Sequence, residues 1–116
     1  MTLPGYHKYG AVSERDFQRQ VRDIASLHGW DEHVVYNSRR SPEGWPDLFF
    51  VRVGACVVPA CKTPVANKAV AFECKTEKGK ATYAQRHWLN MLDGVPGITA
   101  MLIRPSDIDK VIEVLR

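Results

Sequence analysis

Residues 48–53 constrain the fold most strongly, because the four residues 48–51 place apolar side chains on both faces of an extended strand. A strand that is apolar on both faces predicts a central position in a sheet that is covered on each side. Residues 69–75 start with a similar apolar run and predict a second strand. A chain of 116 residues has room for one core, so we expect both strands in one sheet.

Three amphipathic segments predict helices that cover this sheet. Ser13 is a suitable N-cap for the first helix, with Asp16 at the position of the second half of a capping box. Thr82 and Gln85 form the same pattern at the start of the second helix, and the last helix starts at Pro105. Each segment carries apolar residues at helical spacing, which is typical of a helix that packs on a sheet.

Two further strands complete the predicted order α, β, β, β, α, β, α. The first is short and covers residues 34–36, and the second covers residues 98–103. Residues 1–12 mix glycine and proline with polar and aromatic residues and predict a flexible arm. Residues 13–116 therefore predict a single α/β domain with a mixed central sheet flanked by helices.

Cysteine usage and charge narrow the class of protein. Three cysteines are an odd number, which argues against a closed disulfide framework, and no apolar run approaches the roughly 20 residues of a membrane span. The N-terminus lacks the pattern of a secretory signal, so we expect a reducing, cytoplasmic location, in the host cytoplasm if the chain is phage-encoded. The net charge of +3 is compatible with a polyanionic partner without indicating one by itself.

Asp47, Glu73 and Lys75 lie at the ends of the two central strands. Because alternate residues of a strand face the same side, Glu73 and Lys75 project together and Cys74 points away. If the strands are antiparallel with Asp47 opposite residue 73 or 75, the three charged side chains share one face, whereas a one-residue slip separates them. Carboxylates that converge beside an ammonium group predict a site for a hard cation, and this combination suggests metal-dependent cleavage of nucleic acid.

Each candidate also has an ordinary structural explanation. Charged residues are common at strand ends, and a carboxylate such as Glu14 stabilises the first turn of any helix. Gln85 can act in its capping box alone. A zinc site is a further alternative: Cys56 and Cys61 have a loose zinc spacing, and His28, His33 or His87 could complete the ligand set.

Several stretches resemble a known nuclease superfamily. Pro46-Asp47, followed by Glu73-Cys74-Lys75, is similar to the motif of the PD-(D/E)xK nucleases, and more narrowly of the small standalone VRR-NUC family common in phage and prophage. The chain departs from that family at Cys74, where an aliphatic residue is usual, and in its longer segment 54–68. The similar stretches are residues 13–18, 38–48 and 72–80, Gln85 with Trp88 and Leu89, and residues 104–107.

This resemblance implies a restriction-endonuclease-like αβββαβ core and a metal-dependent DNA endonuclease. Lys75 would orient or deprotonate the attacking water, and Gln85 would orient Lys75 or the substrate phosphate. The ligands of Mg²⁺ or Mn²⁺ would be Asp47, Glu73, the carbonyl of Cys74 and, through water, Glu14.

Basic residues near the site predict a track for the nucleic-acid backbone, because such contacts position a substrate without reading its bases. They are Arg39, Arg40, Lys78, Lys80 and Arg86. The resemblance also implies branched or junction DNA as substrate and a homodimer, for which Trp30 and residues 57–58 are candidate interface residues. Two alternatives stay open: a nucleic-acid-binding module that does not cleave, and a subunit of a phage DNA-processing complex that cuts only with a partner.

Overall fold

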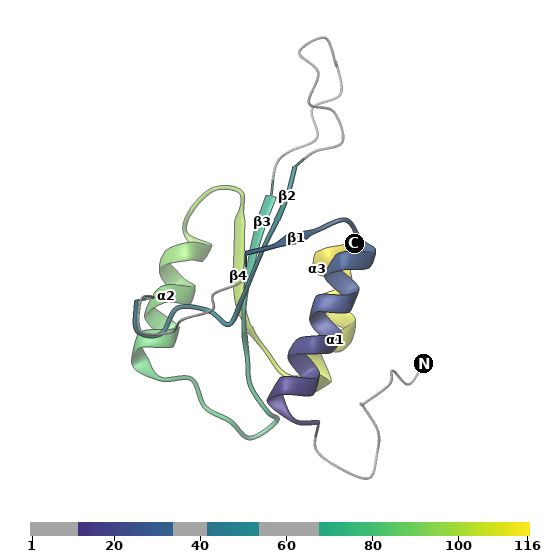
Figure 1. Cartoon of the computed structure of the whole chain (residues 1–116). Coiled ribbons are helices and arrows are strands. Elements are labelled where there is room, and N and C mark those ends of the chain that lie inside the picture. Colours follow the sequence, from purple (N-terminus) through teal and green to yellow (C-terminus); the bar gives the residue numbers. More distant parts are fainter. Residues whose placement is uncertain (1–11, 34–41, 54–67) are drawn as a thin grey trace.

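The computed structural model describes residues 12–33, 42–53 and 68–116. Within these residues the chain is a mixed α/β domain with one four-stranded sheet and three α-helices (Figure 1). None of the helices in this part of the chain is long and apolar enough to cross a membrane. In chain order the elements are α1 (Glu14–Leu27), β1 (Asp31–Glu32), β2 (Leu48–Arg52), β3 (Lys68–Cys74), α2 (Tyr83–Asp93), β4 (Ile98–Ile103), a 3₁₀ turn (Pro105–Asp107) and α3 (Ile108–Leu115).

The sheet has the order β1-β2-β3-β4, so the two predicted central strands do lie at its centre. β2 pairs antiparallel with β3, and β3 pairs parallel with β4. Figure 1 shows α1 and α3 on one side of the sheet and α2 on the other side. The predicted α/β class, the mixed sheet and its flanking helices are confirmed for the described residues.

Alternate residues of the central strands supply a separate core on each face of the sheet. Leu48 and Phe72 are fully buried in the cluster that includes α1 and α3, whereas Ala71 packs with Leu89 of α2. Burial of one large apolar side chain stabilises a fold by about 1.5–3 kcal/mol. The helices on both faces of the sheet therefore contribute to its stability through the side chains that they cover. Val51 is 38% exposed, which corrects the expectation that residues 48–53 are covered on both faces along their whole length.

The helix caps agree with the sequence, with one difference. The Ser13 hydroxyl accepts a hydrogen bond from the Asp16 amide, but the reciprocal bond of a capping box is not formed at this helix. At α2 both halves form, because the Thr82 hydroxyl accepts from the Gln85 amide and the Gln85 side chain accepts from the Thr82 amide. Val12, predicted to lie in the arm, is buried in the core, so the folded domain includes this residue.

Several other expectations need correction or fall outside the described residues. Residues 34–36 lie outside them, and the first strand that the structure shows is β1, at Asp31–Glu32. Trp30, a candidate interface residue, is 5% exposed and its indole nitrogen donates to the Leu115 carbonyl at 2.8 Å, so it offers little surface to a partner. Residues 57–58, proposed for the same interface, lie outside the described part of the chain.

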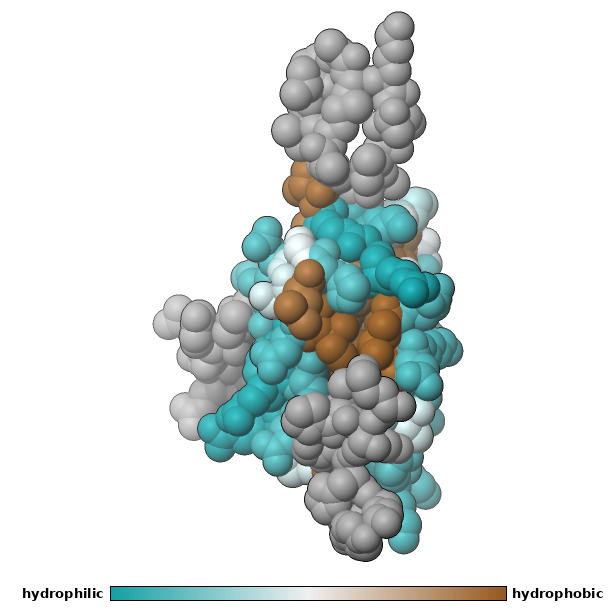
Figure 2. Space-filling view, turned by 90° about the vertical axis from the view of Figure 1, so that its right-hand side faces the viewer, coloured by the Kyte–Doolittle hydropathy of each residue, from teal (hydrophilic) through white to brown (hydrophobic). Residues whose placement is uncertain are grey.

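The face of the domain that carries α1 and α3 is only partly polar. Ile24 of α1 and Ile108 of α3 are half-buried and pack against the larger core. Figure 2 shows hydrophobic residues gathered in the middle of this face, within a frame of hydrophilic ones. The larger core therefore reaches the surface on this side of the sheet.

Local contacts occupy part of the outer edge of β4. In the parallel ladder the even-numbered residues of β4 point their amides away from β3. The Ala100 amide donates to the Asp93 carboxylate at 3.1 Å, and the Ile98 amide donates to the Val95 carbonyl at 3.1 Å. The Arg104 amide, just beyond the strand, donates to Asp107 at 2.9 Å. Amides that are already bonded do not pair with another strand, so the amides of Ile98 and Ala100 are not available for sheet-to-sheet association.

Candidate active site

The register of β2 and β3 brings Asp47 beside Glu73. Leu48 pairs with Phe72, so the next step of the antiparallel ladder places Asp47 opposite Glu73. This is one of the two registers expected to bring the carboxylates together. The odd-numbered residues at this point face α2, while Cys74 faces the opposite core.

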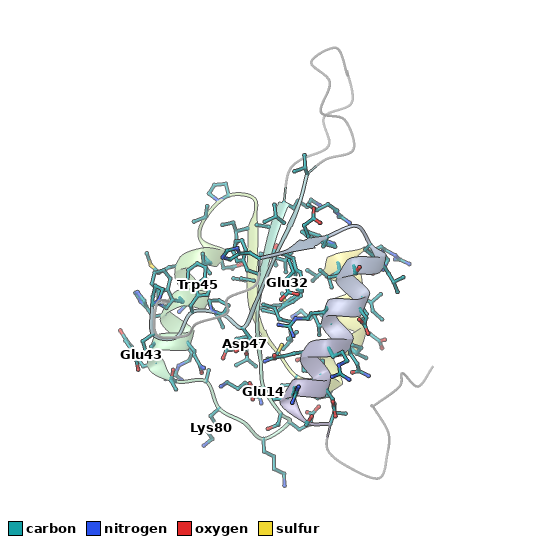
Figure 3. All side chains as sticks on the ribbon, viewed as in Figure 1. Glu14, Glu32, Glu43, Trp45, Asp47 and Lys80 are labelled. Atoms are coloured by element: carbon teal, nitrogen blue, oxygen red, sulfur yellow. The ribbon has the colours of Figure 1, made fainter. Side chains whose placement is uncertain are left out.

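Hydrogen bonds from two backbone amides fix the position of the carboxylates. The Asp47 amide donates to Oε2 of Glu73 at 3.2 Å, and the Cys74 amide donates to Oδ2 of Asp47 at 2.9 Å. On the other side, the Lys75 ammonium lies 3.5 Å from Oε1 of Glu73. The three charged side chains singled out from the sequence therefore meet at one end of the sheet, where Figure 3 labels Asp47.

Pro46 leaves the carbonyl of Cys74 without its ladder donor. The amides of Ala69 and Lys75 bond to β4, so by alternation the amide and carbonyl of Cys74 point toward the start of β2. If the register is continued two residues past Leu48, the residue opposite Cys74 is Pro46, which has no amide hydrogen to donate. A carbonyl oxygen is therefore directed to the end of the strand where the Asp47 carboxylate lies.

Burial makes this carboxylate pair bind protons more tightly than carboxylates do in water. Burial is the main reason that the pKa of Glu73 rises from 4.5 to about 7, and the charge of Asp47 raises it further while Lys75 opposes the rise. Burial also raises the pKa of Asp47, although its hydrogen bond from the Cys74 amide and the charge of Lys75 act in the other direction. Two close carboxylates without a bound cation therefore retain a proton near neutral pH.

The loop before Asp47 is anchored on α2, a feature that the sequence reasoning missed. Gly44 has φ +84°, and a Cβ atom there would lie 2.4 Å from the Ala84 carbonyl carbon and 2.6 Å from the Gln85 nitrogen. The next residue, Trp45, packs edge-on against Trp88 with ring centroids 5.2 Å apart. The sequence feature that could have predicted this anchoring is the Gly-Trp pair just before Pro46-Asp47. Only glycine lets the backbone of the loop come so close to the backbone of α2.

A second missed residue, Arg104, holds the turn that follows the site. Its guanidinium donates to the Thr76 and Gly79 carbonyls, both at 2.6 Å. Glu77 of the same turn accepts hydrogen bonds from the amide and the hydroxyl of Ser106, at 2.6 and 3.0 Å. The turn after Lys75 is thus fixed from two sides, although the resemblance of residues 104–107 assigned Arg104 no role.

The other predicted site residues lie at different places. Glu14 begins α1, on the opposite face of the sheet, but at the same end of the domain as Asp47 (Figure 3). Its charge joins burial and the two site carboxylates in raising the pKa of the Cys74 thiol. Gln85 uses its side-chain oxygen in the capping box. Lys78, Lys80 and Arg86 are exposed, and Arg39 and Arg40 lie outside the described residues.

The donors present suit a small hard cation. Among the described residues no group of three or more His, Cys, Asp and Glu side chains is arranged to hold a metal. Mg²⁺ needs fewer, because it commonly binds one or two carboxylates and keeps several waters. Asp47, Glu73 and the Cys74 carbonyl form such an all-oxygen set. The zinc alternative stays a prediction, because Cys56 and Cys61 lie outside the described part.

Comparisons with protein-family models, with curated proteins and with solved structures gave no match for this chain. The function therefore has to be argued from the site itself.

Proposed function

We propose that this protein is a Mg²⁺- or Mn²⁺-dependent DNA endonuclease of the PD-(D/E)xK type, similar to the VRR-NUC family and with its restriction-endonuclease-like core. The observation that carries the proposal is the buried carboxylate of Glu73, which accepts a hydrogen bond from the amide of half-buried Asp47 and lies 3.5 Å from the Lys75 ammonium. A buried carboxylate beside a second one is costly for the fold unless it serves a ligand or a reaction. The order of the strands and helices supports the same proposal.

The residues of the site have distinct tasks in this reaction. Asp47, Glu73 and the Cys74 carbonyl would hold the metal, which when bound supplies a Lewis acid for the phosphate and lowers the pKa of a water. The Lys75 ammonium donates a hydrogen bond to the attacking water or to a phosphate oxygen, and it neutralises negative charge that develops there. Glu73 keeps Lys75 aimed into the site through their ion pair.

Basic side chains beside the site support a nucleic-acid substrate. A shallow hollow of about 520 Å³ lies between α2 and β4, and Lys80, Arg86 and Arg104 line it. Leu102 also lines this hollow and is the β4 partner of Glu73, so the hollow adjoins the site. Such cations hold phosphates irrespective of sequence, which agrees with a preference for branched or junction DNA over a base sequence.

Cleavage of a small substrate panel tests the proposal. Supercoiled plasmid, single strand, flap and four-way junction are incubated with Mg²⁺, Mn²⁺ or EDTA. We expect metal-dependent cutting that Glu73→Gln abolishes and that Glu113→Gln, an exposed substitution on α3, leaves intact. Cutting that survives in Glu73→Gln would reject the mechanism. DNA binding without any cutting would favour a binding module or a subunit that needs a partner.

A further inference from the structure

The outer face of α2 carries two parallel aromatic rings with space beside them. Tyr83 is 78% exposed, and its ring is inclined by only 16° to that of His87, with centroids 6.4 Å apart. The two nearly parallel rings stack on one another. A hollow of about 280 Å³ is lined by these two residues with Arg86 and Asn90.

The apolar packing of the domain does not explain this arrangement. The buried residue of α2 is Leu89, and neither Tyr83 nor His87 belongs to a core cluster. A single exposed aromatic residue is ordinary on a protein surface. Two parallel rings that line one hollow together with a cation form a more specific arrangement, which suits a planar ring attached to a phosphate.

The hollow on α2 is connected to the proposed active site through Arg86. Arg86 lines both this hollow and the basic hollow that Lys80 and Arg104 share. The basic hollow also includes Leu102, which pairs with Glu73 across β3 and β4. Aromatic rings, cations and carboxylates thus follow one another across the α2 side of the domain, as a bound strand requires.

We propose that α2 binds an unpaired nucleotide next to the cleaved phosphodiester, with its base stacked on the exposed ring of Tyr83 and its phosphate at Arg86. A base inside a duplex has both faces covered by its neighbours, so only an unstacked base can stack on this ring. This inference rests on the proposed nuclease function and specifies its substrate: nucleic acid with a single-stranded segment at the cleavage site, such as a flap.

Binding measured without cleavage separates this inference from the nuclease proposal. Oligonucleotides that carry 2-aminopurine as a fluorescent base are titrated in EDTA, as a single strand and as a duplex of the same sequence. Stacking on an aromatic side chain contributes about 1–3 kcal/mol per base. We therefore expect Tyr83→Ala to weaken single-strand binding by about tenfold, to reduce quenching of the probe and to leave duplex binding unchanged.

Matched variants complete the test. Tyr83→Phe keeps the ring and should bind as the wild type does, and Met91→Ala, an exposed change farther along α2, should have no effect. Glu73→Gln should bind the single strand normally although it does not cut, so loss of cleavage alone leaves the inference standing. Equal losses of single-strand and duplex binding in Tyr83→Ala, or no loss of either, would overturn it.

Discussion

At the scale of single residues, the raised pKa of Glu73 makes stability depend on pH. Glu73 ionises near 4.5 in the unfolded chain and near 7 in the metal-free native state. Between these values the native state retains a proton that the unfolded state has released, so the free energy of unfolding falls as pH rises through this window. We expect a fall of up to about 3 kcal/mol in EDTA, measured by urea unfolding from pH 4.5 to pH 8.

The variant Glu73→Gln provides the control for that prediction. It removes the titrating group and keeps the shape of the side chain, so most of the decline between pH 4.5 and pH 7 should disappear. A decline of unchanged size in Glu73→Gln would show that another group is responsible.

The same proton competes with a metal for the carboxylate pair. Because a ligand must be deprotonated to bind a cation, the apparent affinity for Mg²⁺ should fall about tenfold for each pH unit below the pKa of Glu73. Calorimetric titration of Mg²⁺ between pH 5.5 and pH 8 measures this slope. We expect a plateau above about pH 7 in the wild type and little binding by Glu73→Gln at any pH, whereas a pH-independent affinity would place the metal elsewhere.

At the scale of elements, the approach of the loop before Asp47 to α2 depends on Gly44. Alanine at this position adds the strain of a positive φ and places Cβ 2.4 Å from backbone of Ala84, so the loop or the helix must move. We expect Gly44→Ala to destabilise the fold by about 2–4 kcal/mol and to weaken metal binding, because Asp47 moves with the loop. Urea unfolding and Mg²⁺ titration measure the two effects.

Gly29 offers a matched control for Gly44. It also has a positive φ, +81°, but a Cβ there would meet no atom within 4 Å. Gly29→Ala should therefore cost only the strain of the left-handed conformation, about 1–2 kcal/mol, and should leave metal affinity unchanged. Equal effects of the two substitutions on metal binding would contradict the proposed anchoring.

The turn after Lys75 depends on Arg104 in a similar way. Removing its guanidinium in Arg104→Ala leaves the Thr76 and Gly79 carbonyls without their donor, so the turn should loosen while the core stays intact. Hydrogen bonds to charged groups contribute about 1.5–3 kcal/mol, and we expect amide exchange in residues 76–80 to rise accordingly. Arg116→Ala, a change at an exposed ion pair, should leave that exchange unaltered.

At the scale of the whole molecule, local patterns predicted most of the sheet and the carboxylate pair. The apolar runs at residues 48–51 and at the start of β3 predicted two strands of one covered sheet, and the alternation of side chains put Glu73 and Lys75 on one face. The pattern left the register of the two strands open, and the pairing of Leu48 with Phe72 then aligns Asp47 with Glu73. Gly44 and Arg104 act through contacts with segments far along the chain, and no local pattern reports such contacts. The burial of Trp30 was not predicted for the same reason, since its indole nitrogen bonds to the carbonyl of Leu115, far along the chain.

The proposed single active site per chain limits how a junction can be cut. One domain with one carboxylate pair cuts one strand at a time, so cutting both strands of a junction in one binding event needs two copies, as the proposed homodimer provides. The bonded amides of Ile98 and Ala100 disfavour an interface formed by pairing two β4 strands along this edge. We expect the wild type to linearise a cruciform plasmid directly, because both copies cut before the complex dissociates.

Mixing wild type with Glu73→Gln then reports on the dimer. If subunits exchange, mixed dimers hold one working site and release nicked circles. The nicked share of the product should therefore increase as the inactive variant is added. The total number of plasmids that are cut at least once should fall in proportion to the fraction of active sites. A monomeric enzyme gives no such change in the ratio of nicked to linear product, because each molecule acts independently. An unchanged product ratio across the mixing series, together with a single-chain mass in sedimentation, would therefore reject the homodimer and leave the single-site chemistry untouched.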